Sequence, residues 1–223
     1  GGDYLISKRT NAIIASSSLE NCFIKYPFLE PSLLYGGNPI PIMHNKLIEA
    51  MGINDVKDIN DVIPDGLEVI NLEGHSLGQI GFKTSDNVYF IGDSLIDENT
   101  INKYKIFYLT DIRQYLNSLD KLNKLEGKLF VPSHGPVLED IHDLVKINNK
   151  GIEDIENYLM EILKQEKSFE MIMDNFWQDY NLPKMEMQYI LDGSIIKNYL
   201  TYLYNEEKIT YVFKNNNIYW SKK

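Results

Sequence analysis

The sequence is poor in cysteine and in basic residues. Cys22 is the only cysteine among 223 residues, so neither an intramolecular disulfide nor a cysteine-rich zinc site can organise the fold. There are 22 Lys and Arg residues against 32 Asp and Glu residues, which gives a formal net charge of −10. Because proteins that bind phosphate backbones extensively are usually basic, broad contact with nucleic acid is disfavoured.

Long apolar segments are lacking as well. No run approaches about 18 apolar residues, the length that would indicate a membrane span. Residues 1–5 show no basic leader ahead of an apolar stretch. Apolar residues still make up 43% of the chain and charged residues 24%, an ordinary balance for a globular protein. We therefore expect a folded cytoplasmic protein that does not bind membranes.

The first two thirds of the chain predict strands that are interleaved with helices. Apolar or alternating runs predict strands over residues 12–15, 67–72, 79–83, 88–91 and 128–131. Apolar residues at helical spacing predict a helix over residues 110–125, and a shorter helix is expected over residues 45–51, ending at Gly52. This alternation predicts an α/β sheet layered with helices.

The pattern changes after the polar stretch at residues 148–151 (NNKG). Amphipathic runs predict helices over residues 152–164, 169–180 and 187–204, followed by a β-hairpin with strands over residues 209–213 and 218–220. Three helices and a hairpin within about 70 residues are typical of a winged-helix unit. We therefore predict two domains, residues 1–147 and residues 148–223.

Three side chains of metal-binding type each follow the end of a predicted strand. His75 comes after the strand over 67–72, Asp93 after that over 88–91, and His134 after that over 128–131. In layered α/β folds, ligand sites gather at the edge where strands end. Neutral imidazoles suit zinc or iron, and a carboxylate can bridge two cations. Each motif alone is more typical of a turn, but the three together predict a metal site.

Three segments carry a resemblance to a known family. Residues 74–81 (GHSLGQIG), 90–95 (FIGDSL) and 131–136 (VPSHGP) resemble the last three motifs of the metallo-β-lactamase superfamily, and the match covers about residues 1–146. The resemblance implies a partial αββα sandwich for the first domain. It also implies a hydrolase that acts on a small-molecule ester, thioester, lactone or phosphodiester.

The resemblance further implies a ligand set. His75 would take one divalent metal and His134 the other, with Asp93 between them. Zinc is the first choice of metal, and iron and manganese are the alternatives. The nucleophile of this family is hydroxide supplied by the metals, so no further catalytic side chain is assigned.

The first motif of the family, His-x-His-x-Asp-His, is not present in the printed sequence. In relatives two glycines commonly follow that motif, and Gly1-Gly2 is interpreted as those glycines, with the chain truncated just after the motif. We expect the protein that carries the motif to be a hydrolase, and residues 1–223 alone to bind metal weakly and to be inactive. The alternative is a non-catalytic regulatory or scaffold protein, in which the lactamase-like half is degenerate and the winged helix binds a partner.

Weaker candidates lie in loops that could line the site. Glu30 and Tyr35 are predicted to lie in a long loop, and Tyr104 and Tyr108 follow the Asp93 turn, so these four are expected to contact substrate. Cys22, beside apolar neighbours, is interpreted as a buried and inert thiol.

The second predicted domain shows little sign of binding DNA. Its third predicted helix carries one lysine, Lys197, and no arginine over residues 188–204, and carboxylates outnumber lysines over residues 150–223. A packing or dimerisation module is favoured over a DNA reader on these electrostatics, and a homodimer is left open.

Overall fold

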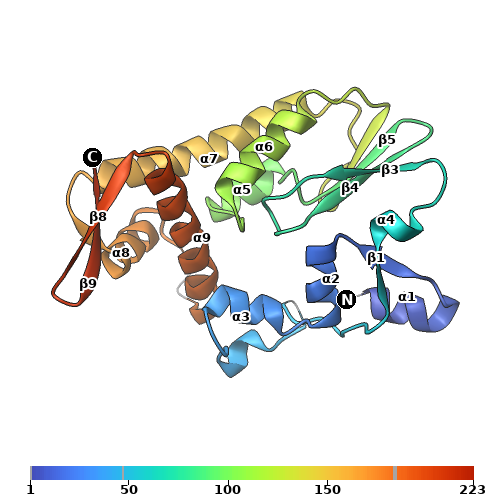
Figure 1. The fold of residues 1–223 in the computed structure, drawn as a ribbon. Coiled ribbons are helices and arrows are strands. Elements are labelled where there is room, and N and C mark those ends of the chain that lie inside the picture. The colour runs from blue at the N-terminus through green and yellow to red at the C-terminus, as the bar shows by residue number, and fades with distance from the viewer. Residues whose placement is uncertain (1, 47, 183–184) are drawn as a thin grey trace.

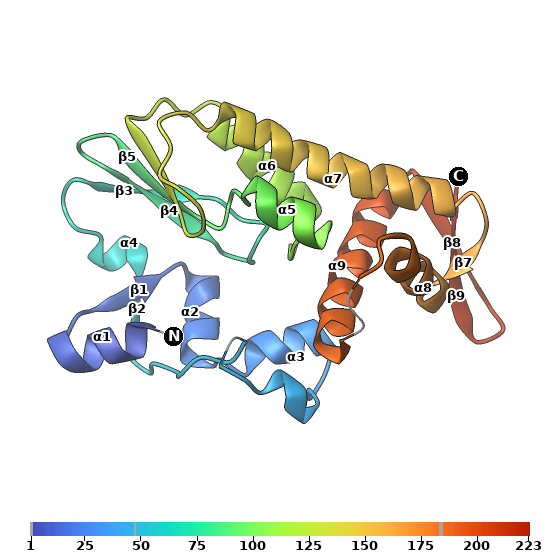
Figure 2. The same ribbon diagram turned by 180° about the vertical axis from the view of Figure 1, so that it is seen from behind.

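The structure is a computed structural model that describes residues 2–46, 48–182 and 185–223. Figure 1 shows a sheet with helices above it, the N-terminal elements below it, and the C-terminal elements beyond the end of the longest helix. Figure 2 shows the same arrangement from behind. The architecture is mixed α/β, which confirms the fold class predicted from the sequence. None of the helices in the described ranges is both long and apolar enough to cross a membrane.

The N-terminal elements form a small layer around two parallel strands. In chain order they are α1 (Gly2–Thr10), β1 (Ile14–Ser16), α2 (Ser18–Lys25), α3 (Leu29–Tyr35), the 3-10 turn η1 (Pro41–Met43), β2 (Val56–Asp58) and α4 (Ile59–Val62). The side chain of Ser17 caps α2 by accepting a hydrogen bond from the backbone N–H of Glu20. β1 pairs in parallel with β2, so two segments about 40 residues apart in the sequence are hydrogen-bonded in this layer.

The helix predicted over residues 45–51 is wrong for the described residues of that segment. Only one turn forms there, in which the backbone N–H groups of Ile48 and Glu49 both donate to the carbonyl of Asn45. The chain then passes tightly against the preceding layer, because a Cβ on Gly52 would lie 2.9 Å from the carbonyl oxygen of Lys25. Gly52 thus marks a close approach of two segments rather than the cap of a helix.

The central sheet has four strands, and its direction explains where the motifs meet. The strands are β3 (Leu67–Asn71), β4 (Ile80–Thr84), β5 (Val88–Gly92) and β6 (Leu129–Pro132), and they lie in that order. β3 and β5 are both antiparallel to β4, while β6 is parallel to β5. Three of the four strands therefore run in one direction and end at the same edge of the sheet.

Helices cover one face of this sheet and bury the main core. They are α5 (Glu98–Tyr104), α6 (Ile112–Leu122) and α7 (His142–Ile162), which lie above the sheet in both ribbon views. The amphipathic face of α6 packs inward, and Tyr115, Leu119 and Leu122 are fully buried. Burial of such side chains contributes about 1.5–3 kcal/mol each to stability, so α6 contributes strongly to the packing of the helices on the sheet.

The C-terminal elements follow the order predicted for residues 152–223. They are β7 (Lys167–Ser168), α8 (Phe169–Asp179), α9 (Glu186–Asn205), β8 (Ile209–Lys214) and β9 (Asn217–Lys222), with the sheet order β7-β9-β8. The hairpin is confirmed, and this order is compatible with a winged-helix-like unit. The domain boundary predicted between residues 147 and 148 lies inside α7, which continues for 21 residues from the first part of the chain into the second.

Candidate metal centre and adjoining pocket

His75 lies on a tight turn after β3. Gly74, just before it, has φ +124°, and a Cβ at that position would lie 2.2 Å from the backbone nitrogen of Tyr115. Only glycine fits between the strand end and the start of α6 at this distance. The carbonyl of Gly74 accepts hydrogen bonds from the backbone N–H and the hydroxyl of Thr110, which fixes the turn against the segment before α6.

Asp93 lies on a second turn, after β5. The register of β5 against β6 shifts between Phe90 and Gly92, and such irregularities re-aim the residues that follow. Ser94 is fully buried and donates to the carbonyl of Ile91, and its hydroxyl oxygen accepts from Nε2 of Gln79 at 2.5 Å. These buried bonds hold the turn that presents Asp93.

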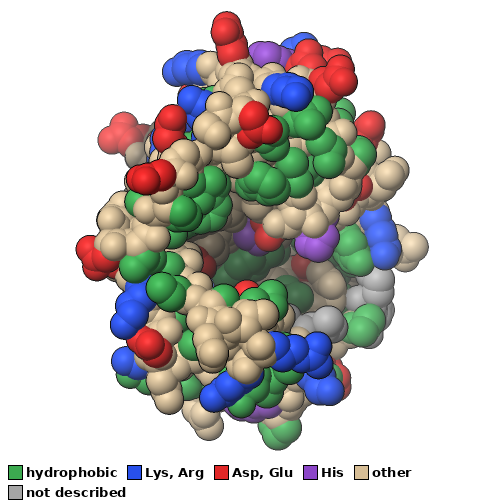
Figure 3. Space-filling model, turned by 90° about the vertical axis from the view of Figure 1, so that its right-hand side faces the viewer, with side chains coloured by type: hydrophobic (Ala, Val, Ile, Leu, Met, Phe, Trp, Pro, Cys, Tyr) green, Lys and Arg blue, Asp and Glu red, His purple; other side chains and the backbone are tan. Residues whose placement is uncertain are grey.

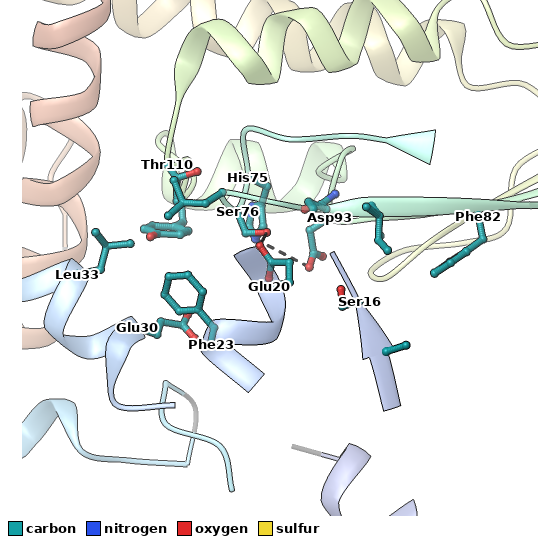
Figure 4. Close-up of a pocket in the computed structure, with 16 residues that line it drawn as sticks. Ser16, Glu20, Phe23, Glu30, Leu33, His75, Ser76, Phe82, Asp93 and Thr110 are labelled. Atoms are coloured by element: carbon teal, nitrogen blue, oxygen red, sulfur yellow. Dashed lines mark hydrogen bonds and ion pairs between the residues drawn. The ribbon is translucent and has the colours of Figure 1, made fainter. Parts of the chain in front are cut away.

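The structure brings the three strand-end side chains together. Nε2 of His75 lies 3.9 Å from Oδ2 of Asp93, and Nε2 of His134 lies 3.7 Å from Oδ1 of Asp93. Figure 4 shows the contact between His75 and Asp93 as a dashed line. Each oxygen of one carboxylate thus faces a different imidazole. The side chain of His134 is 78% exposed, whereas those of His75 and Asp93 are mostly covered.

The environment of His75 favours the neutral ring that metals bind. Burial lowers the pKa of His75, and the charge of Asp93 offsets part of that effect. Its Nδ1 atom is buried and faces the backbone of Tyr108 without completing a hydrogen bond to any described residue. The ring of Tyr108 contacts His75 edge-on, with ring centroids 5.8 Å apart. The ring of His75 is therefore held with Nε2 directed at Asp93.

The three donors are of metal-binding type, but they do not form a closed site for one ion. Two imidazoles and a carboxylate are the ligand types that zinc, iron and manganese accept in proteins. Within the described ranges, however, no three or more His, Cys, Asp and Glu side chains form a group that could hold a single ion. An ion bound at any of these three side chains would therefore need further ligands.

A pocket of about 390 Å³ lies beside His75 and Asp93. Its opposite wall comes from α2 and α3, through Glu20, Phe23 and Glu30. Figure 3 shows a hollow with acidic and histidine side chains around it, and Figure 4 shows the side chains inside the pocket. The pocket therefore lies between the N-terminal layer and the edge of the sheet where the strands end.

Glu20 joins these two layers. Its Oε1 atom accepts hydrogen bonds from the backbone N–H of Gly78 at 2.9 Å and from the hydroxyl of Ser76 at 2.8 Å. The hydroxyl of Ser17 donates to the carbonyl of Gly78 at 2.7 Å. The start of α2 is thereby tied to the loop that follows His75, which keeps the pocket wall in place.

The weaker candidates from the sequence are divided by the structure. The long loop predicted around Glu30 and Tyr35 is wrong, because both residues lie on α3. Glu30 and Tyr108 line the pocket, whereas Tyr35 and Tyr104 are exposed and are not among its lining residues. Burial raises the pKa of Tyr108, and the charges of Glu30 and Glu20 raise it further, so its hydroxyl stays protonated.

The sequence analysis did not identify Glu20 and Phe23 as residues of the pocket wall, and it placed Cys22 wrongly. Glu20 carried a signal, because Ser17 and Glu20 have the spacing of a capping box, but its carboxylate bonds to the loop at 76–78 instead of to the helix start. Phe23 carried no signal beyond its place on an apolar helix face. The interpretation of Cys22 as buried is wrong, because Cys22 is exposed.

Comparisons with known proteins bear on the family and the fold of this chain. The family model described as "Metallo-beta-lactamase superfamily" matches residues 1–134. A metallo-beta-lactamase family protein from Thermus thermophilus is similar in structure, with a TM-score of 0.65 and 16% identity over 95% of this chain and 72% of that chain. A beta-lactamase domain protein from Burkholderia ambifaria gives a TM-score of 0.56 and 13% identity over 82% of this chain and 57% of that chain. At these identities the two structures establish a shared fold.

Proposed function

The chain belongs to the metallo-beta-lactamase superfamily, and we propose that it serves as a metal-dependent hydrolase. The observation that supports this proposal is the position of Asp93, whose two carboxylate oxygens face Nε2 of His75 and Nε2 of His134. The reaction would be hydrolysis of an ester, thioester, lactone or phosphodiester bond in a small molecule. Zinc is the metal proposed first, with iron or manganese as alternatives.

Each side chain of the centre has a role in this proposal. His75 and His134 would each hold one cation, and Asp93 would hold both. Bound cations would lower the pKa of water and so supply hydroxide near neutral pH. Tyr108 orients the ring of His75 by its edge contact, and Glu20 fixes the loop after it. Phe23 contributes an apolar side chain to the pocket wall.

The other two histidines do not complete the ligand set. His44 pairs with Glu49 at 2.7 Å, and His142 pairs with Asp140 at 2.6 Å. The printed sequence also has no His-x-His-x-Asp-His motif. We therefore propose that residues 1–223 alone bind divalent metal weakly and turn over little substrate, because three ligands shared by two ions leave each coordination shell incomplete.

Metal titration tests the proposal directly. Zinc added to residues 1–223 is expected to bind weakly, and Asp93→Asn is expected to abolish the binding that remains. His142→Asn is the matched control, since it removes an imidazole outside the centre. Two tightly held metals per chain would overturn the claim of an incomplete set. Zinc binding that is unchanged in both Asp93→Asn and His134→Ala would show that zinc does not bind at this site.

The lack of a closed metal group among the described residues favours one second candidate. In it the lactamase-like half is degenerate, and the chain is a regulatory or scaffold protein whose winged-helix-like unit binds a partner or forms a homodimer. Reading the coding sequence upstream of Gly1 separates the two candidates. A His-x-His-x-Asp-His segment there supports the hydrolase, and a start codon at that point supports the scaffold. A cytoplasmic location and the lack of nucleic-acid binding belong to both candidates.

A further inference from the structure

We propose that the pocket beside the metal centre selects substrates that carry an alkylammonium group, and that Glu30 recognises this cation. The inference rests on the proposed hydrolase function, because it assigns a substrate class to the same site. It concerns the wall of the pocket that faces His75 and Asp93. A hydrolase with this wall would act on a neutral ester, thioester or lactone bond in a molecule that is positively charged elsewhere.

The described lining of the pocket carries negative charge without a Lys or Arg. Three carboxylates, those of Glu20, Glu30 and Asp93, are among its lining residues in the described ranges. Glu20 is engaged by Ser76 and Gly78, and Asp93 is engaged by the two histidines. Glu30 forms no ion pair with any residue in the described ranges. Its charge is therefore free to meet a cationic ligand.

The surroundings of Glu30 are largely apolar. Phe23, Leu33 and Tyr108 line the same pocket, and Figure 4 draws Phe23, Glu30 and Leu33 on one side of it. Burial raises the pKa of Glu30, and the charge of Glu20 raises it further. Glu30 is nevertheless an exposed residue overall, so its carboxylate would attract an entering cation from partly hydrated surroundings.

Aromatic and carboxylate groups together suit alkylammonium ions. The face of an aromatic ring attracts such a cation by about 0.5–2 kcal/mol, and a carboxylate adds a direct charge interaction. The same wall would repel an anion. A phosphodiester carries its negative charge next to the bond to be cut, so this pocket disfavours the phosphodiester among the proposed substrates.

A pair of esters with the same shape tests the inference. Acetylcholine carries a quaternary nitrogen where 3,3-dimethylbutyl acetate carries a neutral carbon. Binding of each to residues 1–223 is measured by calorimetry at constant ionic strength, with and without zinc. We expect acetylcholine to bind about tenfold more tightly, which corresponds to a difference of about 1.4 kcal/mol.

Variants assign that preference to Glu30. Glu30→Gln keeps the size of the side chain and is expected to bring the affinity ratio close to one. Glu68→Gln is the matched control, since Glu68 is exposed on β3 and does not line the pocket. Leu33→Lys changes a side chain that is 47% exposed and adds positive charge to the wall, so it is expected to remove the preference as well. Thermal unfolding of each variant shows whether the fold is kept.

The outcomes separate this inference from the proposed function. Equal binding of the two esters, or a preference that survives both Glu30→Gln and Leu33→Lys, would overturn the recognition of ammonium. Zinc binding that is unchanged in both Asp93→Asn and His134→Ala, with the ammonium preference intact, would overturn the proposed metal centre and leave the recognition standing. Zinc binding at this centre without any ammonium preference would overturn the recognition of ammonium and leave the hydrolase standing.

Discussion

Asn198 on α9 donates a hydrogen bond from Nδ2 to the carbonyl oxygen of Leu109, at 2.7 Å, although the two residues are 89 positions apart. Leu109 is fully buried and directly follows Tyr108, which lines the pocket. α9 also contacts α3, the helix that carries Glu30. The C-terminal unit therefore contacts two parts of the chain that carry pocket residues: the segment at Leu109, which follows Tyr108, and α3.

Replacing Asn198 should loosen this support. Asn198→Ala leaves the carbonyl of Leu109 without its partner, which is expected to cost about 1–2 kcal/mol in the free energy of unfolding. Urea unfolding measures this loss. Asn205→Ala is the control, because Asn205 is exposed at the end of the same helix and is expected to change the free energy by less than about 0.5 kcal/mol. Equal effects of the two variants would show that the bond to Leu109 does not matter.

Gly74 should tolerate no side chain. A Cβ there would lie 2.2 Å from the nitrogen and 2.4 Å from the Cα of Tyr115, and both are backbone atoms that cannot rotate away. Gly74→Ala is therefore expected to lower the free energy of unfolding by about 3 kcal/mol or more, and to weaken zinc binding by displacing His75. Thermal unfolding and zinc titration measure the two effects. Gly37→Ala is the control, since a Cβ at Gly37 meets nothing within 4 Å.

Asn148 should be the most costly polar residue to replace in α7. It is fully buried, and its Oδ1 accepts from the backbone N–H of Ile96 and from the hydroxyl of Tyr115. Its Nδ2 donates to the carbonyls of Ile96 and Leu144. Asn148→Leu leaves several buried polar groups unpaired, each of which costs about 1–3 kcal/mol.

A neighbouring asparagine supplies the comparison for Asn148. Asn149 makes one side-chain hydrogen bond, to the carbonyl of Val145. Asn149→Ala is expected to change the free energy of unfolding by about 1 kcal/mol at most. Chemical denaturation of both variants at neutral pH measures the difference. If Asn148→Leu were no worse than Asn149→Ala, the hydrogen bonds that tie Ile96 to α7 would contribute little to stability.

The convergence of the three strand-end motifs could be predicted from the sequence, because it depends mainly on the direction of the strands. β3, β5 and β6 run the same way, so the residues after them meet at one edge wherever the loops lead. The strands themselves are confirmed to within one or two residues. Local periodicity was sufficient for these elements, since each is a short apolar run between turn residues.

Contacts between distant segments could not be predicted in the same way. The stretch at residues 148–151 resembles a linker by composition, yet it lies within α7. Asn148 is polar because it bonds to the loop at Ile96, and Gly151 is small because a Cβ there would lie 3.3 Å from the ring of Phe107. The role of Glu20 at Gly78 is likewise set by a partner 58 residues away. Single-sequence patterns do not contain these partners.

Asp192 should make the stability of the protein depend on pH. Its side chain is fully buried on α9, and its two oxygens accept from Nε1 of Trp177 and from Nε2 of Gln188. Burial raises the pKa of Asp192 to about 6, although both hydrogen bonds act in the opposite direction. Because the ordinary pKa of an aspartate is about 3.9, the carboxyl ionises more readily in the unfolded chain than in the folded one. The folded state therefore loses stability as the pH rises from about 4 to about 6, and the loss is constant above that range.

Asp192→Asn removes this ionisation and should stabilise the protein at neutral pH. The amide of Asn can accept from Trp177 and donate to Gln188, whose own amide can turn over to present its oxygen. A gain of about 1–3 kcal/mol in the free energy of unfolding is expected at pH 7.5, and it should shrink steadily as the pH falls toward 4, where the wild-type carboxyl is neutral. Urea unfolding of both proteins across this range measures the gain. A difference that stays the same at every pH would mean that Asp192 is not destabilised by its charge, and that the variant acts through packing alone.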